Sequence, residues 1–454
     1  MLPLLNRRSA AWLLGICFMM SRPADAGPLP ERVERAAQER IAAGINQTLV
    51  FGVVDGDNSE VVAFGKLDDG KTLDGDTVYE IGSITKTFTA TLLAQTALSG
   101  RVTLDTPVAK LLPDFKIPSR GGMEITLEEL GTQRSALPRE PSNMASKDPA
   151  NPYADYDAAE LKAFLAEYQL PRDPGAAYEY SNLGFGLLGH ALAQLEHTTY
   201  GAQIDEKILK PLGMTMSATV FSDAMRSHLA PGHDILGTPA NNWDFDALAG
   251  AGAIRSSAGD MLRYLKANMG IDPSPLAAAM KLAQRPRSDM TETMYIGLAW
   301  MTTNKGIIWH DGTTGGYRSF LGFTADGRHG VVVLSNNTAA KPNDLGFATL
   351  DANAPLAPAY KAIVLPSASL DDYVGSYALS DKFLLKIFRG NDGLIAEATG
   401  QCCPVAIFPS APNEFFAIVV DAQLAFVRDG REKVVAVVVH QGGRVIRAPR
   451  IVGQ

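Results

Sequence analysis

The hydrophobic pattern of the 454-residue chain predicts strands near its start and again after residue 300, with helices between them. Residues 47–64 are expected to form two strands, because the turn-forming run 55–59 separates two β-branched stretches. Further strands are expected over 78–81, 307–309, 320–323 and 331–334. The last of these is an unbroken apolar run, which is typical of a central strand.

Helical periodicity separates these two groups of strands. Apolar residues at helical spacing predict a mostly buried helix over 83–98, which begins directly after the strand 78–81. Three more helices are expected over 157–168, 183–195 and 256–268. Strands at both ends with helices between them indicate an α+β sandwich with a helical insertion.

The last part of the chain has a different pattern. Residues 353–366 are rich in Ala and Pro, which predicts a linker. Short alternating stretches with frequent turns follow and predict a small all-β barrel. Its expected strands are 383–388, 394–398, 415–420, 424–427 and 434–440. The expected division is a signal peptide (1–26), a main domain (27–352), the linker (353–366) and an all-β accessory domain (367–454).

The first 26 residues have the pattern of an export signal. Arg7 and Arg8 precede an apolar stretch over 10–20, and Ala24-Asp25-Ala26 offers small residues for cleavage before Gly27. A short membrane anchor is the alternative interpretation, but the apolar stretch is short for a bilayer span. We therefore expect a periplasmic or secreted protein with no stable membrane span after signal cleavage.

Charge and cysteine content argue against two kinds of ligand, nucleic acids and metal ions. The net charge of −8, with no run of basic residues, disfavours a nucleic-acid partner. Cys402 and Cys403 are adjacent and offer no metal-ligand spacing. Two buried free thiols are expected there, with a vicinal disulfide as the alternative. We expect neither a metal nor a cofactor.

The first candidate for chemistry is Ser83-Ile84-Thr85-Lys86 at the start of the predicted helix 83–98. A serine hydroxyl needs a neighbouring base to become a nucleophile. Lys86 lies one helical turn further on, so both side chains share a face. A helix start also supplies free N–H groups for an oxyanion. Ser-x-x-Lys alone arises by chance on many surface helices, but here it opens an apolar helix after a strand.

Two further motifs add polar groups. Tyr180-Ser181-Asn182 precedes a buried helix; a tyrosine beside a lysine can have a lowered pKa and move a proton, and Asn182 can hold both a substrate amide and Lys86. His310-Asp311-Gly312 ends an apolar strand, where Gly312 would let a substrate backbone lie against the strand. The N–H of Thr313 could complete an oxyanion hole with that of Ser83. Read singly, each motif is also explained by a helix cap or by a surface histidine at a strand end.

The order and spacing of the three motifs resemble the serine β-lactamase and penicillin-binding protein superfamily. The likeness is to class C β-lactamases, D-alanyl-D-alanine carboxypeptidases and related esterases, and it covers roughly residues 41–337. It implies a β-lactamase/transpeptidase-like antiparallel sheet flanked by helices. The stretch 370–451 resembles the lipocalin-like domain appended to some members. The resemblance implies catalytic roles for Ser83, Lys86 and Tyr180, and substrate-binding roles for Asn182, His310, Gly312 and Thr313.

Two positions depart from the resemblance. Class C β-lactamases usually have a lysine where this chain has His310, and a neutral histidine would weaken carboxylate recognition or make it pH-dependent. Many relatives have His-Thr-Ser-Gly before the Leu-Pro at 137–138, whereas this chain has Gln133-Arg134-Ser135-Ala136. The absence of a glycine puts the conformation of that loop in doubt.

These observations predict a serine hydrolase that acts through an acyl-enzyme on β-lactams or D-amino-acid peptides. Lys86 and Tyr180 would move the proton of Ser83, with Tyr180 as the base in deacylation. A carboxylesterase of the same fold is one alternative, because esters need no carboxylate anchor at His310. A penicillin-binding sensor without turnover is the other. The expected partner is a small-molecule or peptide substrate.

Overall fold

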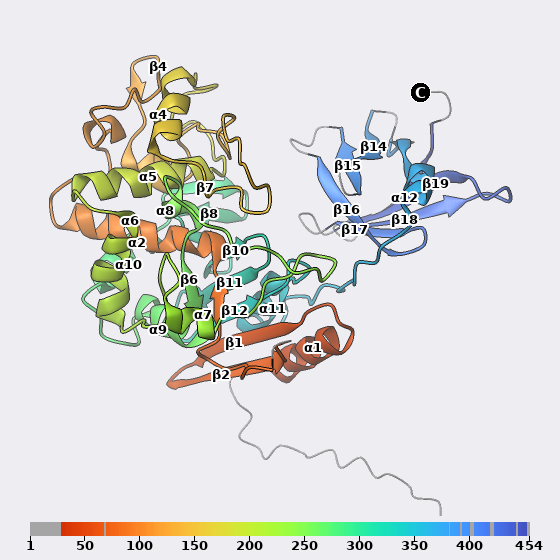
Figure 1. Cartoon of the computed structure of the whole chain (residues 1–454), viewed down its shortest axis with the longest axis horizontal. Helices are drawn as coiled ribbons and strands as arrows, with labels where there is room; N and C mark the ends of the chain where they lie inside the picture. The colour runs from red at the N-terminus through yellow and green to blue at the C-terminus, as the bar shows by residue number, and fades with distance from the viewer. Residues whose placement is uncertain are drawn as a thin grey trace, which may run out of the picture.

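The computed structural model describes residues 29–67, 70–380, 382–390, 393–399, 404–417, 422–441 and 444–451 (Figure 1). The predicted signal peptide 1–26 and the adjacent Cys402 and Cys403 lie outside these ranges. Within them, no helix is long and apolar enough to cross a membrane. Residues 355–366 form neither helix nor strand. The proposed division of the chain into domains stays a prediction.

One antiparallel sheet of eight strands organises the larger part of the chain. The strand 329–335 lies between 48–55 and 318–324, as its unbroken apolar run predicts. In spatial order the strands are β2 (Asn58–Gly65), β1 (Thr48–Asp55), β12 (His329–Ser335), β11 (Arg318–Thr324), β10 (Ile307–Thr313), β9 (Met301–Thr303), β8 (Met294–Ile296) and β7 (Ser288–Thr291).

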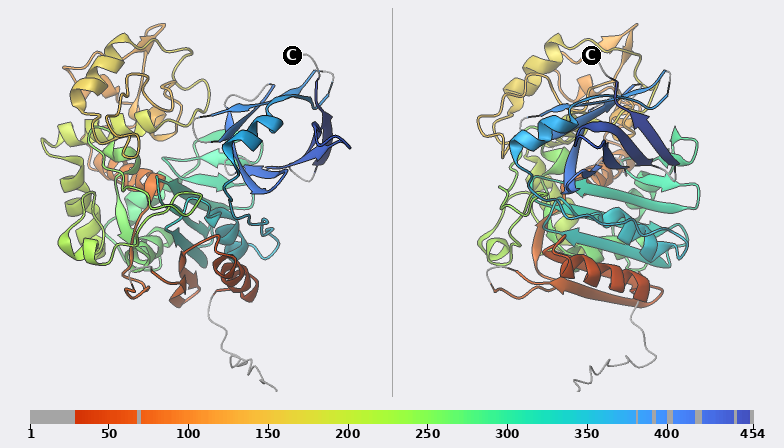
Figure 2. Two further views of the ribbon diagram at one scale, coloured as in Figure 1. Left: turned by 45° about the vertical axis from the view of Figure 1, so that its right-hand side comes forward. Right: turned by 90° about the vertical axis from the view of Figure 1, so that its right-hand side faces the viewer.

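Helices cover both faces of this sheet, as Figures 1 and 2 show. The side chains of β1 alternate between two apolar clusters: Val50 and Val54 pack on one side, Phe51 and Val53 on the other. The first cluster includes residues of α2 (Thr85–Leu98), α9 (Ala258–Met269) and α10 (Ala277–Gln284). The second includes residues of α1 (Glu31–Ala42) and α11 (Pro342–Leu350). The result is the expected α+β sandwich.

The helical insertion packs around α2, whose side chains are buried over most of its length. The helix 182–195 has its two faces in the same apolar cluster as α2, which explains its near-continuous apolar sequence. The helices of this part are α3 (Leu127–Gly131), α4 (Ala158–Glu167), α5 (Asn182–Leu195), α6 (Tyr200–Ile204), α7 (Asp223–Ser227) and α8 (Ala249–Gly252). Short strands β3 (Val78–Glu80) and β6 (Arg255–Ser257) pair beneath them, and β4 (Ser119–Arg120) pairs with β5 (Met123–Glu124).

The C-terminal part is a second antiparallel sheet of eight strands with its own apolar core. Tyr377 in the first strand forms a bridge with Arg450, directly after the last strand, so the sheet is nearly closed into the expected barrel. A short helix, α12 (Ser367–Leu370), precedes it. The strands are β13 (Gly375–Ala378), β14 (Leu384–Arg389), β15 (Leu394–Ala398), β16 (Val405–Ala411), β17 (Glu414–Ala417), β18 (Ala422–Arg428), β19 (Val434–Gln441) and β20 (Arg444–Pro449).

A buried ion pair joins the first helix to the last helix of the sandwich. Arg40 on α1 donates to both carboxylate oxygens of Asp344 on α11, at 3.0 and 2.5 Å. The same guanidinium donates to the carbonyls of Lys341 and Ala357, and the N–H of Ala357 donates to Asp344. The exposed fractions of the two side chains are only 6% and 12%. The pair therefore also holds the start of the segment that leads to the barrel.

We predict that Asp344→Asn lowers the free energy of unfolding by about 3 kcal/mol, because it leaves the buried Arg40 charge without its partner. The matched control is Asp272→Asn, which breaks the more exposed pair with Lys266 and should cost less than about 1 kcal/mol. Urea denaturation of both variants checks this. Equal losses for the two would contradict the role given to the buried pair.

Candidate active site

Ser83 lies in a single 3₁₀ turn, Gly82–Ile84, between strand β3 and helix α2. Gly82 has φ +51°, a left-handed conformation that other residues rarely adopt. Ile81, the residue before this turn, is fixed by two hydrogen bonds. Its N–H donates to the carbonyl of Ile254, and its carbonyl accepts from Ser319 Oγ at 2.8 Å. Ser83 is therefore presented on a fixed turn, with the free N–H groups of a helix start beside it.

Lys86 is fully buried and faces Ser83 from the first turn of α2. Its Nζ lies 3.0 Å from Ser83 Oγ, 2.7 Å from Asn182 Oδ1 and 2.8 Å from the carbonyl of Ala251. Burial holds the pKa of Lys86 well below its usual value, and the nearby Arg139 charge lowers it further, while Glu140 opposes the shift. A lysine in this state can accept the proton of the serine hydroxyl.

Asn182 is the first residue of α5, and its amide connects Lys86 to a carboxylate. Its Nδ2 donates to Glu140 Oε1 at 2.5 Å, and the same oxygen accepts from Tyr153 OH at 2.9 Å. The cap residue Ser181 accepts from the N–H of Gly184 and donates to the carbonyl of Pro138. The position of the amide is thus set by the helix start and by the loop before residue 140.

Tyr180 completes the group around the nucleophile. Lys86 Nζ lies 4.9 Å from the centroid of its ring. Burial raises the pKa of Tyr180, although the nearby Ser83 hydroxyl and the Arg139 charge oppose this. The lowering expected from the sequence is therefore wrong: removal from water outweighs the nearby cations. A phenol in this state keeps its proton and acts as a donor.

The strand β10 leaves one edge open next to Ser83. Strand β9 pairs only with Ile308 and Trp309, so in the described part of the chain the later residues of β10 have no strand partner on that side. The N–H of Thr314 donates to the carbonyl of Tyr317 at 3.0 Å. Because such bonds alternate along an antiparallel pair, the N–H of Thr313 points away from β11 toward the open edge. That orientation suits an oxyanion donor.

The packing of the chain leaves no room for a side chain at Gly312. A Cβ at this position would lie 2.0 Å from the carbonyl oxygen of Ile81 and 2.5 Å from Ser319 Oγ. A Cβ on Gly82 would likewise lie 2.7 Å from the nitrogen of Thr313. The two glycines therefore allow the turn that carries Ser83 to lie directly against the end of β10. The sequence had given Gly312 a role toward a substrate backbone, and the fold gives it this second role.

His310 is buried, with an exposed fraction of 2%, so it is not a surface histidine. Its Nδ1 lies 2.7 Å from the carbonyl of Asp311. Burial and the neighbouring Lys86 lower the pKa of His310 to about 4, against the opposing charge of Asp311. The imidazole is therefore neutral at pH 7, and a permanent positive charge is absent from this side chain.

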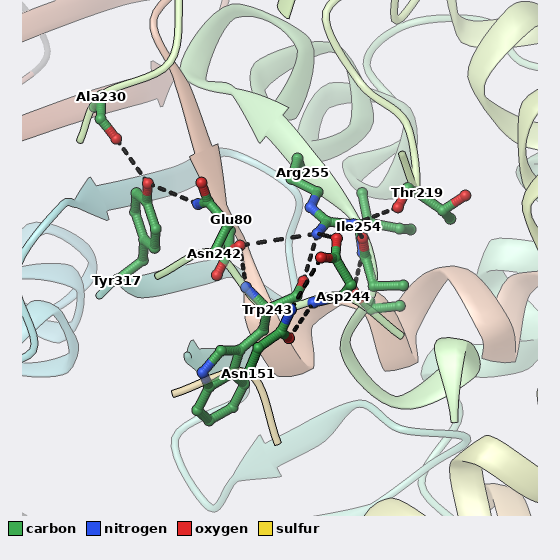
Figure 3. Close-up of polar contacts among 12 residues, drawn as sticks. Glu80, Asn151, Thr219, Ala230, Asn242, Trp243, Asp244, Ile254, Arg255 and Tyr317 are labelled. Carbon is green, nitrogen blue, oxygen red and sulfur yellow. Dashed lines mark hydrogen bonds and ion pairs between the residues drawn. The ribbon is translucent and has the colours of Figure 1, made fainter. Parts of the chain in front are cut away.

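A buried network supports the strand that leads to Ser83 (Figure 3). Arg255 on β6 has a side chain that is 2% exposed; it contacts Asp244 at 2.9 Å and lies 3.9 Å from Glu80 on β3. Its guanidinium also donates to the carbonyls of Thr219 and Trp243. Glu80 accepts from the N–H of Trp243 at 2.8 Å. The strand before the nucleophile is thus joined to the loop that carries Trp243.

That loop places an aromatic group near the site. The ring of Trp243 lies 5.2 Å from that of Tyr153, which stacks on Phe245 at 4.6 Å. The indole nitrogen of Trp243 would lie 2.6 Å from a Cβ placed on Gly315, which follows the end of β10. Since Tyr153 also binds Glu140, the aromatic group is continuous with the Asn182 amide.

The loop 133–136 contains left-handed residues although it has no glycine. Gln133 and Ala136 have φ values of +60° and +63°, so two ordinary residues adopt the left-handed conformation. Gln133 compensates with contacts: its Oε1 accepts from the N–H of Ser181 at 2.7 Å, and its carbonyl accepts from Glu179. The N–H of Asn182 in turn donates to the carbonyl of Arg139. These bonds fix the loop against the start of α5.

Comparison with known proteins agrees with this geometry. The model of the Beta-lactamase family matches residues 33–354, which is more than half of the chain. The chain belongs to the Beta-lactamase family. A second family model, described as a domain of unknown function (DUF3471), matches residues 359–448, which include nearly all of the barrel. The likeness of the barrel to lipocalins stays a prediction.

The curated relatives of this chain have low sequence identity to it. Protein flp of Staphylococcus aureus (strain COL) is 27% identical over 331 residues, which cover 67% of this chain and 64% of flp. The match thus spans less than two thirds of that relative. The D-alanyl-D-alanine-carboxypeptidase/endopeptidase AmpH of Escherichia coli (strain K12) is 28% identical over 303 residues, which cover 62% of this chain and 77% of AmpH.

Solved structures confirm the fold. A class C β-lactamase superposes with a TM-score of 0.62 at 20% identity, covering 70% of this chain and 94% of that one. A β-lactamase/D-alanine carboxypeptidase from Pseudomonas syringae gives a TM-score of 0.63 at 19% identity, covering 72% and 99%. The β-lactamase-like fold expected from the three motifs is therefore correct.

The fold brings together the side chains of the first two motifs and sets the end of β10 against the turn of Ser83. Sequence reasoning missed Glu140 and Arg139, which follow a Leu-Pro pair that the resemblance had used only as a landmark. It also missed the pair Glu80 and Arg255. A charged residue within a predicted buried strand, as at Glu80, was the available signal for that pair.

We predict that Gly312→Ala lowers kcat at least about 100-fold, because the added methyl forces the turn of Ser83 away from β10 and a displacement near 1 Å has this order of effect. The control is Gly75→Ala, whose Cβ would meet only ordinary contacts with Val61 at 3.6 Å. Steady-state kinetics and thermal melting of both variants check this. Unchanged kcat in Gly312→Ala would contradict the close approach.

Proposed function

We propose that this protein is a serine hydrolase that acts through an acyl-enzyme on Ser83. The observation that carries the proposal is the contact of Ser83 Oγ with a buried lysine whose pKa is well below its usual value. Membership of the Beta-lactamase family supports a hydrolase. A neutral amine at hydrogen-bond distance from a hydroxyl is the arrangement that activates a serine nucleophile.

In the proposed acylation step, Ser83 Oγ attacks the carbonyl carbon of the substrate while its proton moves to Lys86 Nζ. The oxyanion is stabilised by the N–H groups of Ser83 and Thr313. The proton then passes through the hydroxyl of Tyr180 to the leaving nitrogen or oxygen as its bond to the carbonyl carbon breaks. The products are the Ser83 ester and the protonated leaving group.

In the proposed deacylation step, water attacks the carbonyl carbon of the ester and its proton is taken up by the Lys86–Tyr180 pair. Since burial raises the pKa of Tyr180, a free phenolate is an unfavourable base. Lys86 is the better acceptor, and Tyr180 relays the proton. The ester bond to Ser83 breaks and Oγ regains a proton, which returns the enzyme to its starting state.

For the substrate we propose D-amino-acid peptides and β-lactams. The relatives and neighbours carry names of both kinds, a D-alanyl-D-alanine-carboxypeptidase/endopeptidase and class C β-lactamases. The amide of Asn182 and the open edge of β10 suit a substrate with a peptide-like backbone. An ester substrate is the second candidate, and the neutral His310 is the observation that favours it. Export from the cytoplasm remains part of the proposal.

We predict that incubation with benzylpenicillin adds the mass of one penicilloyl group to the wild-type protein and none to Ser83→Ala. The control is Ser99→Ala at the other end of α2, where the hydroxyl only donates to the carbonyl of Thr96. This control should acquire the adduct as the wild type does. Intact mass spectrometry over time, followed by peptide mapping, provides the measurement.

The time course separates the candidate functions. An adduct that decays within minutes indicates β-lactamase turnover, and one that persists indicates a peptidase or a penicillin-binding sensor. Turnover of a D-alanyl peptide then distinguishes these two. An adduct that forms equally on Ser83→Ala would contradict the role of Ser83. Absence of an adduct on the wild type would reject the lactam substrate and leave esters and D-amino-acid peptides to be tested.

A further inference from the structure

The substrates proposed above carry a carboxylate on the part that leaves, and the site needs a cation to bind it. His310 does not supply the charge, because it is buried and neutral at pH 7. Lys86 is also unsuitable, since it is buried and its three contacts are to Ser83, Asn182 and Ala251. Another positive group must face the site if the carboxylate is recognised.

Arg139 is such a group. It is exposed, and its guanidinium carbon lies 4.9 Å from the centroid of the Tyr180 ring. Among the described residues, this guanidinium has no hydrogen bond or ion pair. The main chain beneath it is fixed, because the carbonyl of Arg139 accepts from the N–H groups of Asn182 and Leu183. Arg139 thus has a main chain fixed by hydrogen bonds and a guanidinium whose N–H groups are available to a ligand.

The nearby acidic groups leave this charge unpaired. Glu140 Oε1 accepts from Asn182 and Tyr153, and Asp311 Oδ2 accepts from Asn343 at 2.9 Å. Neither carboxylate forms an ion pair with Arg139. The other arginine of this region, Arg318 on β11, is half-buried, and its desolvation lowers its pKa against the opposing charge of Asp311. An exposed arginine is the better anchor for a ligand that arrives from water.

The ring under Arg139 identifies which part of the substrate would meet it. The Tyr180 ring lies 4.9 Å from Lys86 Nζ, and Tyr180 is the residue that passes the proton to the leaving group in the proposed mechanism. The amide of Asn182, whose Oδ1 contacts Lys86 Nζ at 2.7 Å, is the group proposed to hold the acyl part. A guanidinium stacked on Tyr180 is therefore near the leaving group.

We propose that Arg139 binds the carboxylate of the leaving group and makes the enzyme selective for substrates with an anionic leaving group. This inference rests on the proposed function and adds the substrate feature that the site recognises. The planar guanidinium can donate two parallel N–H bonds to a carboxylate while its face stays on the Tyr180 ring. Binding the carboxylate there also keeps the leaving atom close to the Tyr180 hydroxyl.

The test uses two thioester substrates with the same N-acyl-D-alanyl group. One releases thioglycolate, which carries a carboxylate, and the other releases thioglycolamide, its neutral isostere. The wild type should prefer the first. Arg139→Gln should reduce this preference, measured as the ratio of the two kcat/KM values, by about 10- to 100-fold, the range for a hydrogen bond to a charged group. Arg139→Lys should fall between, because lysine keeps the charge without the two-pronged donor.

The control is Arg35→Gln on α1, which packs on the opposite face of the sheet from α2. It removes one exposed positive charge and should leave the ratio as in the wild type. A ratio that does not change in Arg139→Gln, or no preference in the wild type, would overturn the proposal. A parallel loss on both substrates would also overturn it, since Arg139 would then act only through Tyr180. Turnover of the neutral thioester by the wild type tests the proposed function independently. If neither thioester is hydrolysed, the proposed function fails, and this inference fails with it.

Discussion

The structure of the site depends on the burial of one lysine. Lys86 sits fully buried at the start of α2, and an ammonium there would lose its hydration, so the pKa falls and the neutral amine is favoured. The three oxygens around Nζ satisfy the neutral amine, because Asn182 Oδ1 and the carbonyl of Ala251 can accept its two N–H donors and the Ser83 hydroxyl can donate to its lone pair. Two of them, on Ser83 and Asn182, are also the groups that would handle a substrate. The same atoms thus satisfy the buried amine and form the reactive site.

The rest of the fold keeps those atoms in place through close backbone contacts and buried charges. Gly82 and Gly312 let the turn of Ser83 lie against β10 with no side chain between them. Arg255 fixes the strand before the turn to the loop of Trp243, as Figure 3 shows. Because these contacts already hold the site in position, its N–H groups need little rearrangement when an oxyanion forms. That is the condition for stabilising an oxyanion by fixed N–H groups.

The sequence predicted the parts of this arrangement that local patterns determine. The helix over 83–98, the central strand over 331–334 and the family resemblance of the three motifs follow from periodicity and spacing. Contacts between distant segments were not predictable, because nothing local places Glu140 beside Asn182. Helix α1 was missed for another reason: its buried face consists of only Val33, Ala37 and the ion-paired Arg40, which is too weak a pattern.

The charge of Lys86 is the central claim, and nuclear magnetic resonance of ¹³C-labelled lysine side chains tests it most directly. The Lys86 signal can be assigned by its loss in Lys86→Arg, and the exposed lysines of the same protein serve as internal references. The account predicts that Lys86 titrates well below these lysines, so that it is neutral at a pH where they are still charged. A Lys86 signal that titrates together with the exposed lysines would contradict the account, because a charged amine could not take the proton of Ser83.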